Sequence, residues 1–139
     1  MSGIEQEMVN KAKQWMAYAD EDMRLAECGL KLTENCPFRL IAYHAQQCAE
    51  KYLKAFLVYK KTDFPYTHNI GYLLELCAKH GEWVKTVEAA EELTPFAITT
   101  RYPGEDEEVS AADAANAIKI ALQVKMSVTD ALKKENFPF

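Results

Sequence analysis

The sequence is poor in the residues that interrupt helices and in the segments that mark several common classes of protein. Only 5 of its 139 residues are glycine and 5 are proline, and no glycine-rich phosphate loop is present. No run approaches the roughly 18 apolar residues of a membrane span. The first residues contain no apolar stretch of signal-peptide length. We therefore expect a protein of the cytoplasm that does not contact membranes.

Cysteine and histidine are also scarce, and their spacing excludes the common metal sites. The four cysteines form no Cys-x-x-Cys pair, and no glutamate precedes any of the three histidines by three positions. Zinc sites and ferritin-like di-iron sites need such spacings. We expect no metal and no cofactor, and reduced thiols that are mostly buried. The net charge of −5 argues against a large basic surface for nucleic acid.

Helical periodicity is what the chain does contain, over almost its whole length. Apolar residues recur at intervals of three and four, and no segment alternates in the manner of a strand. The hydrophobic fraction of 49% is enough for a real core. The pattern predicts one domain over residues 1–139, an all-α, up-and-down bundle of four to five antiparallel helices.

Turn residues set the expected helix boundaries. Pro37 suits a first turn, Gly81 is a typical helix end, and Pro95 should kink or restart the helix that contains it. Ser110 and Asp113 have the spacing of a capping box. The expected helices span residues 4–32, 37–61, 67 or 68 to 81, 83–100 and 110–134, with a loop at 101–109.

The second predicted helix carries two faces where a surface helix carries one. One side is apolar and is lined by Phe38, Ile41, Ala45, Ala49, Tyr52 and Phe56. The opposite side mixes Tyr43, Gln47, Glu50 and Lys54 with Leu40, Leu57 and Val58. Apolar area on this second face should not be left to water. We therefore expect self-association, as a homodimer, through a surface that includes Leu40, Tyr43, Leu57 and Val58.

Several polar residues are candidates for one ligand pocket. Asp22 lies within the apolar stripe of the first helix and needs a partner, because an unpaired buried carboxylate is costly. Glu50 and Lys54 are four residues apart and can pair. Arg101 and Tyr102 place a planar cation and a phenol at a helix end, which suits phosphate or carboxylate binding. We expect Asp22, Glu50, Lys54, His68, Arg101 and Tyr102 to converge, in whole or in part, on one pocket. The alternative is an ion network that only pins a loop.

Arg39 and His44 form an Arg-x4-His string. A histidine that moves protons and an arginine that binds phosphate are the parts of a metal-independent ribonuclease. Five positions on a helix correspond to a rotation of about 140°, so the two side chains should diverge. A chance string is therefore the alternative to a catalytic pair.

Four stretches of the chain together resemble the HEPN domain ("higher eukaryotes and prokaryotes nucleotide-binding"), a helical module. They are Ala-Asp-Glu-Asp-Met at 19–23 with Ala26, Ala-Gln-Gln-Cys-Ala-Glu-Lys at 45–51 with Leu-Lys-Ala at 53–55, Thr-His-Asn-Ile at 67–70 with Leu73 and Leu74, and Thr-Arg-Tyr-Pro at 100–103. The last stretch is similar to an Arg-Tyr-Pro subgroup of the family.

The resemblance implies a helical bundle that often dimerises and is commonly encoded beside a minimal nucleotidyltransferase, as in a toxin–antitoxin pair. Many HEPN proteins are ribonucleases whose Arg-x4-6-His motif converges at a dimer cleft. Here Arg101 has no histidine four to six residues beyond it. We therefore expect a non-catalytic module that binds a nucleotide, another phosphate or a nucleotidyltransferase partner. The alternatives are an RNA-cleaving toxin that uses Arg39 and His44, and a ligand-free assembly protein.

Overall fold

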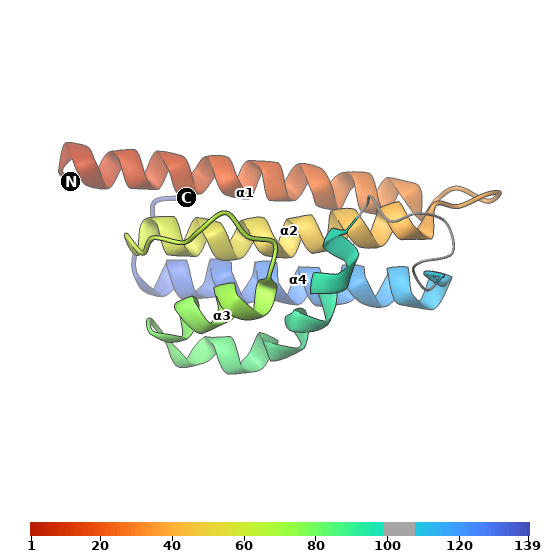
Figure 1. Cartoon of the computed structure of the whole chain (residues 1–139). Coiled ribbons are helices and arrows are strands. Elements are labelled where there is room, and N and C mark those ends of the chain that lie inside the picture. Colours follow the sequence, from red (N-terminus) through yellow and green to blue (C-terminus); the bar gives the residue numbers. More distant parts are fainter. Residues whose placement is uncertain (99–107) are drawn as a thin grey trace.

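The computed structural model describes residues 1–98 and 108–139, and the elements in these ranges are all helices (Figure 1). Their bounds are α1 Gly3–Gly29, α2 Phe38–Tyr59, α3 Ile70–Ala78, η1 Glu82–Ala97 and α4 Ala111–Lys134. No strand occurs within the described ranges. The expected all-α bundle is confirmed.

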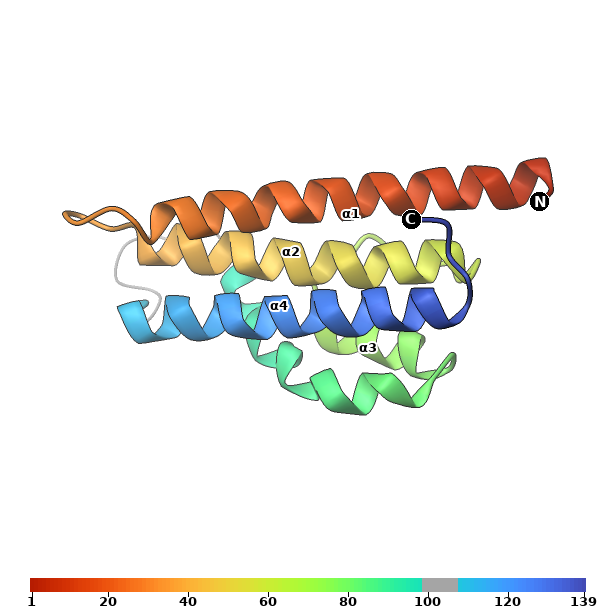
Figure 2. The same cartoon turned by 180° about the vertical axis from the view of Figure 1, so that it is seen from behind.

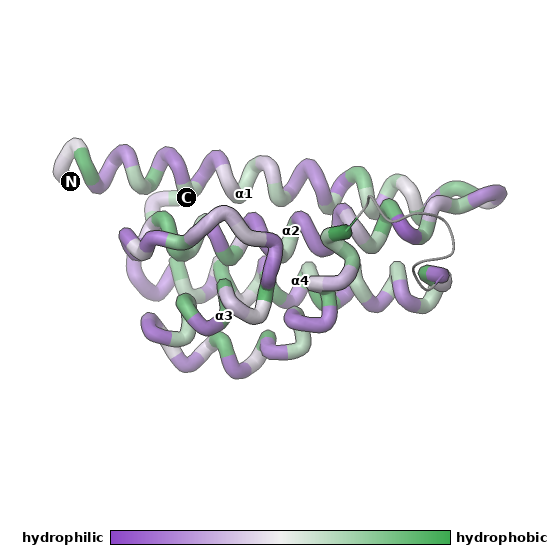
Figure 3. Tube along the Cα trace, in the orientation of Figure 1, coloured by the Kyte–Doolittle hydropathy of each residue, from purple (hydrophilic) through white to green (hydrophobic). Residues whose placement is uncertain are grey.

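α2 is the middle helix of the bundle. α1 packs along one side of it and α4 along another, while α3 packs against α2 and η1, and η1 also packs against α2 and α4 (Figures 1 and 2). The segment of residues 60–69, here called the strap, carries the chain back along the bundle, so α3 points the same way as α2 (Figure 1). Hydrophobic and hydrophilic residues alternate along the helices, as amphipathic packing requires (Figure 3).

The neighbours of α2 explain its two-faced pattern, because the helix is enclosed around most of its circumference. Its buried residues include Gln46, Gln47, Glu50 and Lys54 as well as the apolar ones. Leu57 is fully buried, so its assignment to a free outer surface is wrong. Leu40 does remain exposed, and Tyr43 and Val58 are half-buried.

The buried stripe of α1 leaves out apolar residues at both ends of the segment. Ile4 and Leu30 are 65% and 40% exposed, and the helix ends before Leu32. The buried positions are spaced alternately by three and four residues, which is the seam of a coiled coil. They are Val9, Ala12, Met16, Ala19, Met23 and Ala26. Half of them are alanine, which lets the backbone of α1 lie close to α2.

η1 also departs from the prediction. Its backbone is a 3₁₀ helix, and the non-helical break lies at Val87, with φ −125° and ψ 20°, rather than at Pro95. A 3₁₀ helix has poor hydrogen-bond geometry and is seldom long. A break within the 16 residues of η1 is therefore expected. The capping box is confirmed: Asp113 N donates to Ser110 Oγ, and Ser110 N donates to the Asp113 carboxylate.

Gly29 lies close against the Ile41 side chain of α2, which generates a prediction. A Cβ added there would lie 2.8 Å from Ile41 Cγ1, whereas a Cβ at Gly3 would have no neighbour within 4 Å. Gly29→Ala should therefore lower the free energy of unfolding by about 1–3 kcal/mol through overpacking. Gly3→Ala, the matched control, should be neutral or slightly stabilising. Equal melting temperatures for the two variants would contradict the close approach.

Candidate functional site

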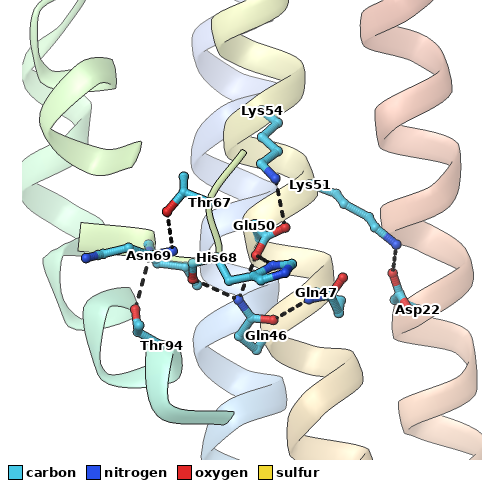
Figure 4. A network of polar contacts seen from close by, with 11 residues as sticks. Asp22, Gln46, Gln47, Glu50, Lys51, Lys54, Thr67, His68, Asn69 and Thr94 are labelled. Atoms are coloured by element: carbon cyan, nitrogen blue, oxygen red, sulfur yellow. Dashed lines mark hydrogen bonds and ion pairs between the residues drawn. The ribbon is translucent and has the colours of Figure 1, made fainter. Parts of the chain in front are cut away.

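A buried polar cluster lies on the side of α2 that faces the strap (Figure 4). The Glu50 carboxylate, only 2% exposed, accepts three hydrogen bonds. Gln46 Nε2 and His68 Nδ1 donate to Oε1 at 3.0 and 2.8 Å, and Lys54 Nζ donates to Oε2 at 3.0 Å. The predicted Glu50–Lys54 pair is therefore present. We call Gln46, Glu50, Lys54 and His68 the strap cluster.

The Lys54 ammonium in this cluster is also surrounded by aromatic rings. Its Nζ lies 5.5 Å from the ring centre of Trp15, 5.7 Å from that of Phe64 and 6.0 Å from that of Tyr66. Aromatic faces attract cations at such distances. Lys54 is therefore held by Glu50 on one side and by three rings on the others, which leaves it no open approach for a phosphate in this conformation.

Further contacts tie the strap to the helices at both of its ends. Near its start, Thr62 Oγ1 and His80 Nε2 lie 2.7 Å apart. At its end, Gln46 Nε2 donates to the His68 carbonyl at 3.4 Å, and Asn69 Oδ1 accepts from Tyr72 N at the start of α3. The strap cluster thus does what the structural alternative to a ligand pocket requires, because it pins the strap to α2.

Asp22 belongs to a second cluster, apart from Glu50 and Lys54. His44 Nδ1 donates to Asp22 Oδ1 at 2.8 Å, and Lys51 Nζ donates to Oδ2 at 2.6 Å. Successive residues of a helix point about 100° apart. Glu50 therefore faces the strap while Lys51 faces α1 (Figure 4). We call Asp22, His44 and Lys51 the α1 cluster.

One sequence signal could have revealed the partner of Asp22. α1 and α2 form an antiparallel hairpin, and residues equally far from its connection lie level with each other. The expected turn spans residues 33–36, and about its middle Asp22 lies level with position 47, three positions beyond His44. Aligning the two predicted helices in this register would have brought His44 among the possible partners of the carboxylate.

A buried thiol lies close to the α1 cluster. Asp20 accepts hydrogen bonds from the Tyr52 hydroxyl and, at 3.0 Å, from Lys125 Nζ, and so links α1, α2 and α4. Burial, followed by the charges of Asp20 and Asp22, raises the pKa of Cys48 to about 12. Burial and the hydrogen bond to Asp20 also raise the pKa of Tyr52 well above its usual value. These groups are held protonated at neutral pH.

Of the remaining predicted site residues, Arg39 and His44 lie among the described residues. Arg39 is exposed, and His44 is directed to Asp22, in keeping with the divergence expected of positions five apart on one helix. Arg101 and Tyr102 lie outside the described residues. Among the described residues, no group of three or more His, Cys, Asp or Glu side chains is arranged to hold a metal ion.

A groove that the sequence did not predict lies where the α1–α2 hairpin turns. Its volume is about 360 Å³, and His44 is its one titratable polar side chain other than a thiol. The lining positions follow helical spacing along both arms of the hairpin. They are Leu25, Cys28, Gly29 and Leu32 from one arm and Pro37, Leu40, Ile41 and His44 from the other. We call this the hairpin groove. Leu25, Leu32 and Leu40 are 56%, 54% and 41% exposed.

Comparison with known proteins agrees with this architecture. A family model described as the HEPN domain matches residues 12–131. The chain belongs to the HEPN domain family. A solved crystal structure, that of TT1696 from Thermus thermophilus, is similar with a TM-score of 0.69 and 26% identity, over 88% of this chain and 99% of that one. No curated protein matches the chain. Within the described residues of this HEPN protein, no helix is long and apolar enough to cross a membrane.

The strap cluster yields a prediction that separates a structural network from a ligand site. Glu50→Ala leaves the Lys54 ammonium buried without its carboxylate and should cost about 3–5 kcal/mol of unfolding free energy. The matched control is Glu7→Ala, which breaks the exposed Glu7–Lys11 pair of the same spacing and should cost at most about 1 kcal/mol. Urea denaturation measures both. If Glu50→Ala costs less than about 1 kcal/mol, the cluster does not hold the fold together, and its role as a ligand site is favoured instead.

The thiols yield a second prediction. Cys28 is exposed, whereas Cys48 and Cys77 are buried with pKa values raised to about 12. Iodoacetamide at mildly alkaline pH should label Cys28 first and the two buried thiols only on unfolding, as read by mass spectrometry. Unfolding lowers the pKa of these two thiols from about 12 to the ordinary value of 9.0. Burial of the protonated thiols therefore stabilises the fold fully below pH 9.0, and this stabilisation is lost as the pH rises towards 12. Equal labelling rates for Cys28 and Cys48 would contradict this.

Proposed function

We propose that this HEPN protein is a non-catalytic binding module that works as a homodimer formed through the hairpin groove. The observation that supports the proposal is the groove itself, where two neighbouring helices leave apolar side chains of helical spacing open to water. Such grooves typically receive an apolar helix face of a partner. Exposed apolar clusters on soluble proteins commonly mark interaction sites.

The charges around the groove favour a second copy of this chain as its occupant. In a two-fold dimer each patch meets its own copy, so a patch must be complementary to itself. The exposed charged side chains from residue 21 to residue 39 comprise as many acids as bases, although the whole chain carries −5. They are Glu21, Glu27 and Glu34, and Arg24, Lys31 and Arg39. This balance suits self-pairing and offers no surplus of positive charge to RNA.

We also propose that the dimer binds a ligand. The family resemblance implies a nucleotide, another phosphate, or a nucleotidyltransferase partner as in a toxin–antitoxin pair. Of the residues proposed for a phosphate, Lys54 is already paired with Glu50 inside the strap cluster. The ligand proposal therefore rests on Arg101 and Tyr102, through the likeness of the Thr-Arg-Tyr-Pro stretch to the Arg-Tyr-Pro subgroup.

One observation favours ribonuclease activity as a second candidate function. Asp22 holds Nδ1 of His44, which fixes the ring and leaves Nε2 for a substrate, as in general acid–base catalysis. His44 lines the hairpin groove, so a dimer formed there brings two such rings near its axis, with Arg39 to bind phosphate. Cleavage of RNA by the parent protein that is abolished in His44→Ala would establish this function. Absence of cleavage by the parent supports the non-catalytic module.

The homodimer generates a prediction about the groove leucines. Leu25→Glu and Leu40→Glu should each convert a dimer to a monomer, because a dimer would bury these carboxylates in an apolar groove. Met126→Glu is the control, since Met126 is 65% exposed on α4 and lies outside the groove. Light scattering after size-exclusion chromatography measures the mass, and melting temperature confirms that each variant folds.

Two outcomes would contradict the homodimer. A parent protein that is monomeric at high micromolar concentration excludes it. If such a monomer instead binds a nucleotidyltransferase, and Leu25→Glu abolishes that binding while Met126→Glu does not, the groove is the docking site of that partner.

A further inference from the structure

We infer that His44 makes self-association through the hairpin groove sensitive to pH, with the dimer favoured when the imidazole is neutral. This inference rests on the proposed homodimer and names a form of regulation at the same surface. Its basis is the position of one histidine that belongs both to the α1 cluster and to the lining of the groove.

The charge balance of the α1 cluster gives the direction of the effect. Asp22, with a side chain 12% exposed, has one partner that is always charged at neutral pH, Lys51, at 2.6 Å. The carboxylate and the ammonium sum to zero while His44 is neutral. A neutral imidazole still donates its Nδ1 proton to Asp22. A second proton on the ring therefore adds an unbalanced positive charge to the cluster.

The other groups near His44 do not cancel that charge. On α1, Asp22 is already paired with Lys51, and Cys28 is an uncharged thiol. On α2, the ring centres of Tyr43 and His44 lie 5.0 Å apart in an edge-on arrangement, and Cys48 stays protonated. From α4, Lys125 is paired with Asp20 at 3.0 Å. Among the described residues, no other carboxylate forms an ion pair with His44.

Besides the Asp22 carboxylate, water stabilises an imidazolium in the monomer, and a second copy would remove that water. The His44 side chain is 24% exposed, and the groove beside it is lined mainly by leucine, isoleucine and proline. Filling the groove with the apolar face of another copy desolvates the ring, which disfavours its charged form. Each copy then releases or excludes one proton on association. A group that binds protons more tightly in the monomer than in the dimer weakens association as pH falls.

The size of the effect follows from two histidines per dimer. Histidine is the side chain that ordinarily changes charge between about pH 5 and about pH 8. Excluding one proton from each copy allows the dissociation constant to change by up to about 100-fold per pH unit within that range. We therefore expect the dissociation constant to rise at least about tenfold between about pH 7.5 and about pH 5.5.

Sedimentation velocity at both pH values tests the inference on three proteins. The parent should dissociate at the lower pH. His44→Gln keeps an amide donor for Asp22 but takes up no proton, so its association should not change with pH. His80→Gln is the control, because His80 contacts Thr62 in the strap, and it should keep the pH dependence of the parent. Circular dichroism at the lower pH verifies that each protein remains folded.

The possible failures are distinguishable. A parent that is equally dimeric at both pH values overturns the role of His44 and leaves the homodimer standing. A His44→Gln variant that dissociates at low pH as the parent does also overturns it, because another group then carries the effect. A parent that is monomeric at both pH values overturns the proposed homodimer itself.

Discussion

Burial of the Glu50 carboxylate is the constraint on which the arrangement of this bundle depends. A charge inside a protein is tolerated only when it is paired and hydrogen-bonded. Glu50 meets this condition with donors from three places: Gln46 one turn before it, Lys54 one turn after it, and His68 at the end of the strap. The third donor must be delivered by a segment remote in the chain. The strap therefore has to lie along α2, and it carries α3 to its place.

Enclosure by these elements decides which surface of α2 remains open. The strap, α3 and η1 cover α2 on the side of Glu50, and alanines at Ala12, Ala19 and Ala26 bring α1 close on another. The first turns of α2, with the end of α1 beside them, keep exposed leucines. Leucines at helical spacing, which would be core residues elsewhere in the bundle, here line the open hairpin groove.

The sequence predicted what depends on local spacing and failed where register between helices matters. Periodicity placed the helices, Ser110 and Asp113 formed the expected cap, and the four-residue interval paired Glu50 with Lys54. Leu57 was placed on the wrong face because helical angle alone does not show how many neighbours a helix has. The Asp22 partners were missed because a pocket was assembled from residue types, without aligning α1 against α2.

The two polar clusters on α2 share the same three kinds of ionisable group and differ in their surroundings. Each joins one carboxylate, one lysine and one histidine: Glu50 with Lys54 and His68, and Asp22 with Lys51 and His44. In the strap cluster, aromatic rings and the strap enclose the lysine, so the network acts as a fastening for the fold. In the α1 cluster, the histidine borders a groove that is open to solvent. Composition alone does not separate a structural network from a responsive one. The His68 ring is the more exposed of the two, at 43% against 24% for His44, so the difference lies in the groove beside His44, which a second protein can fill.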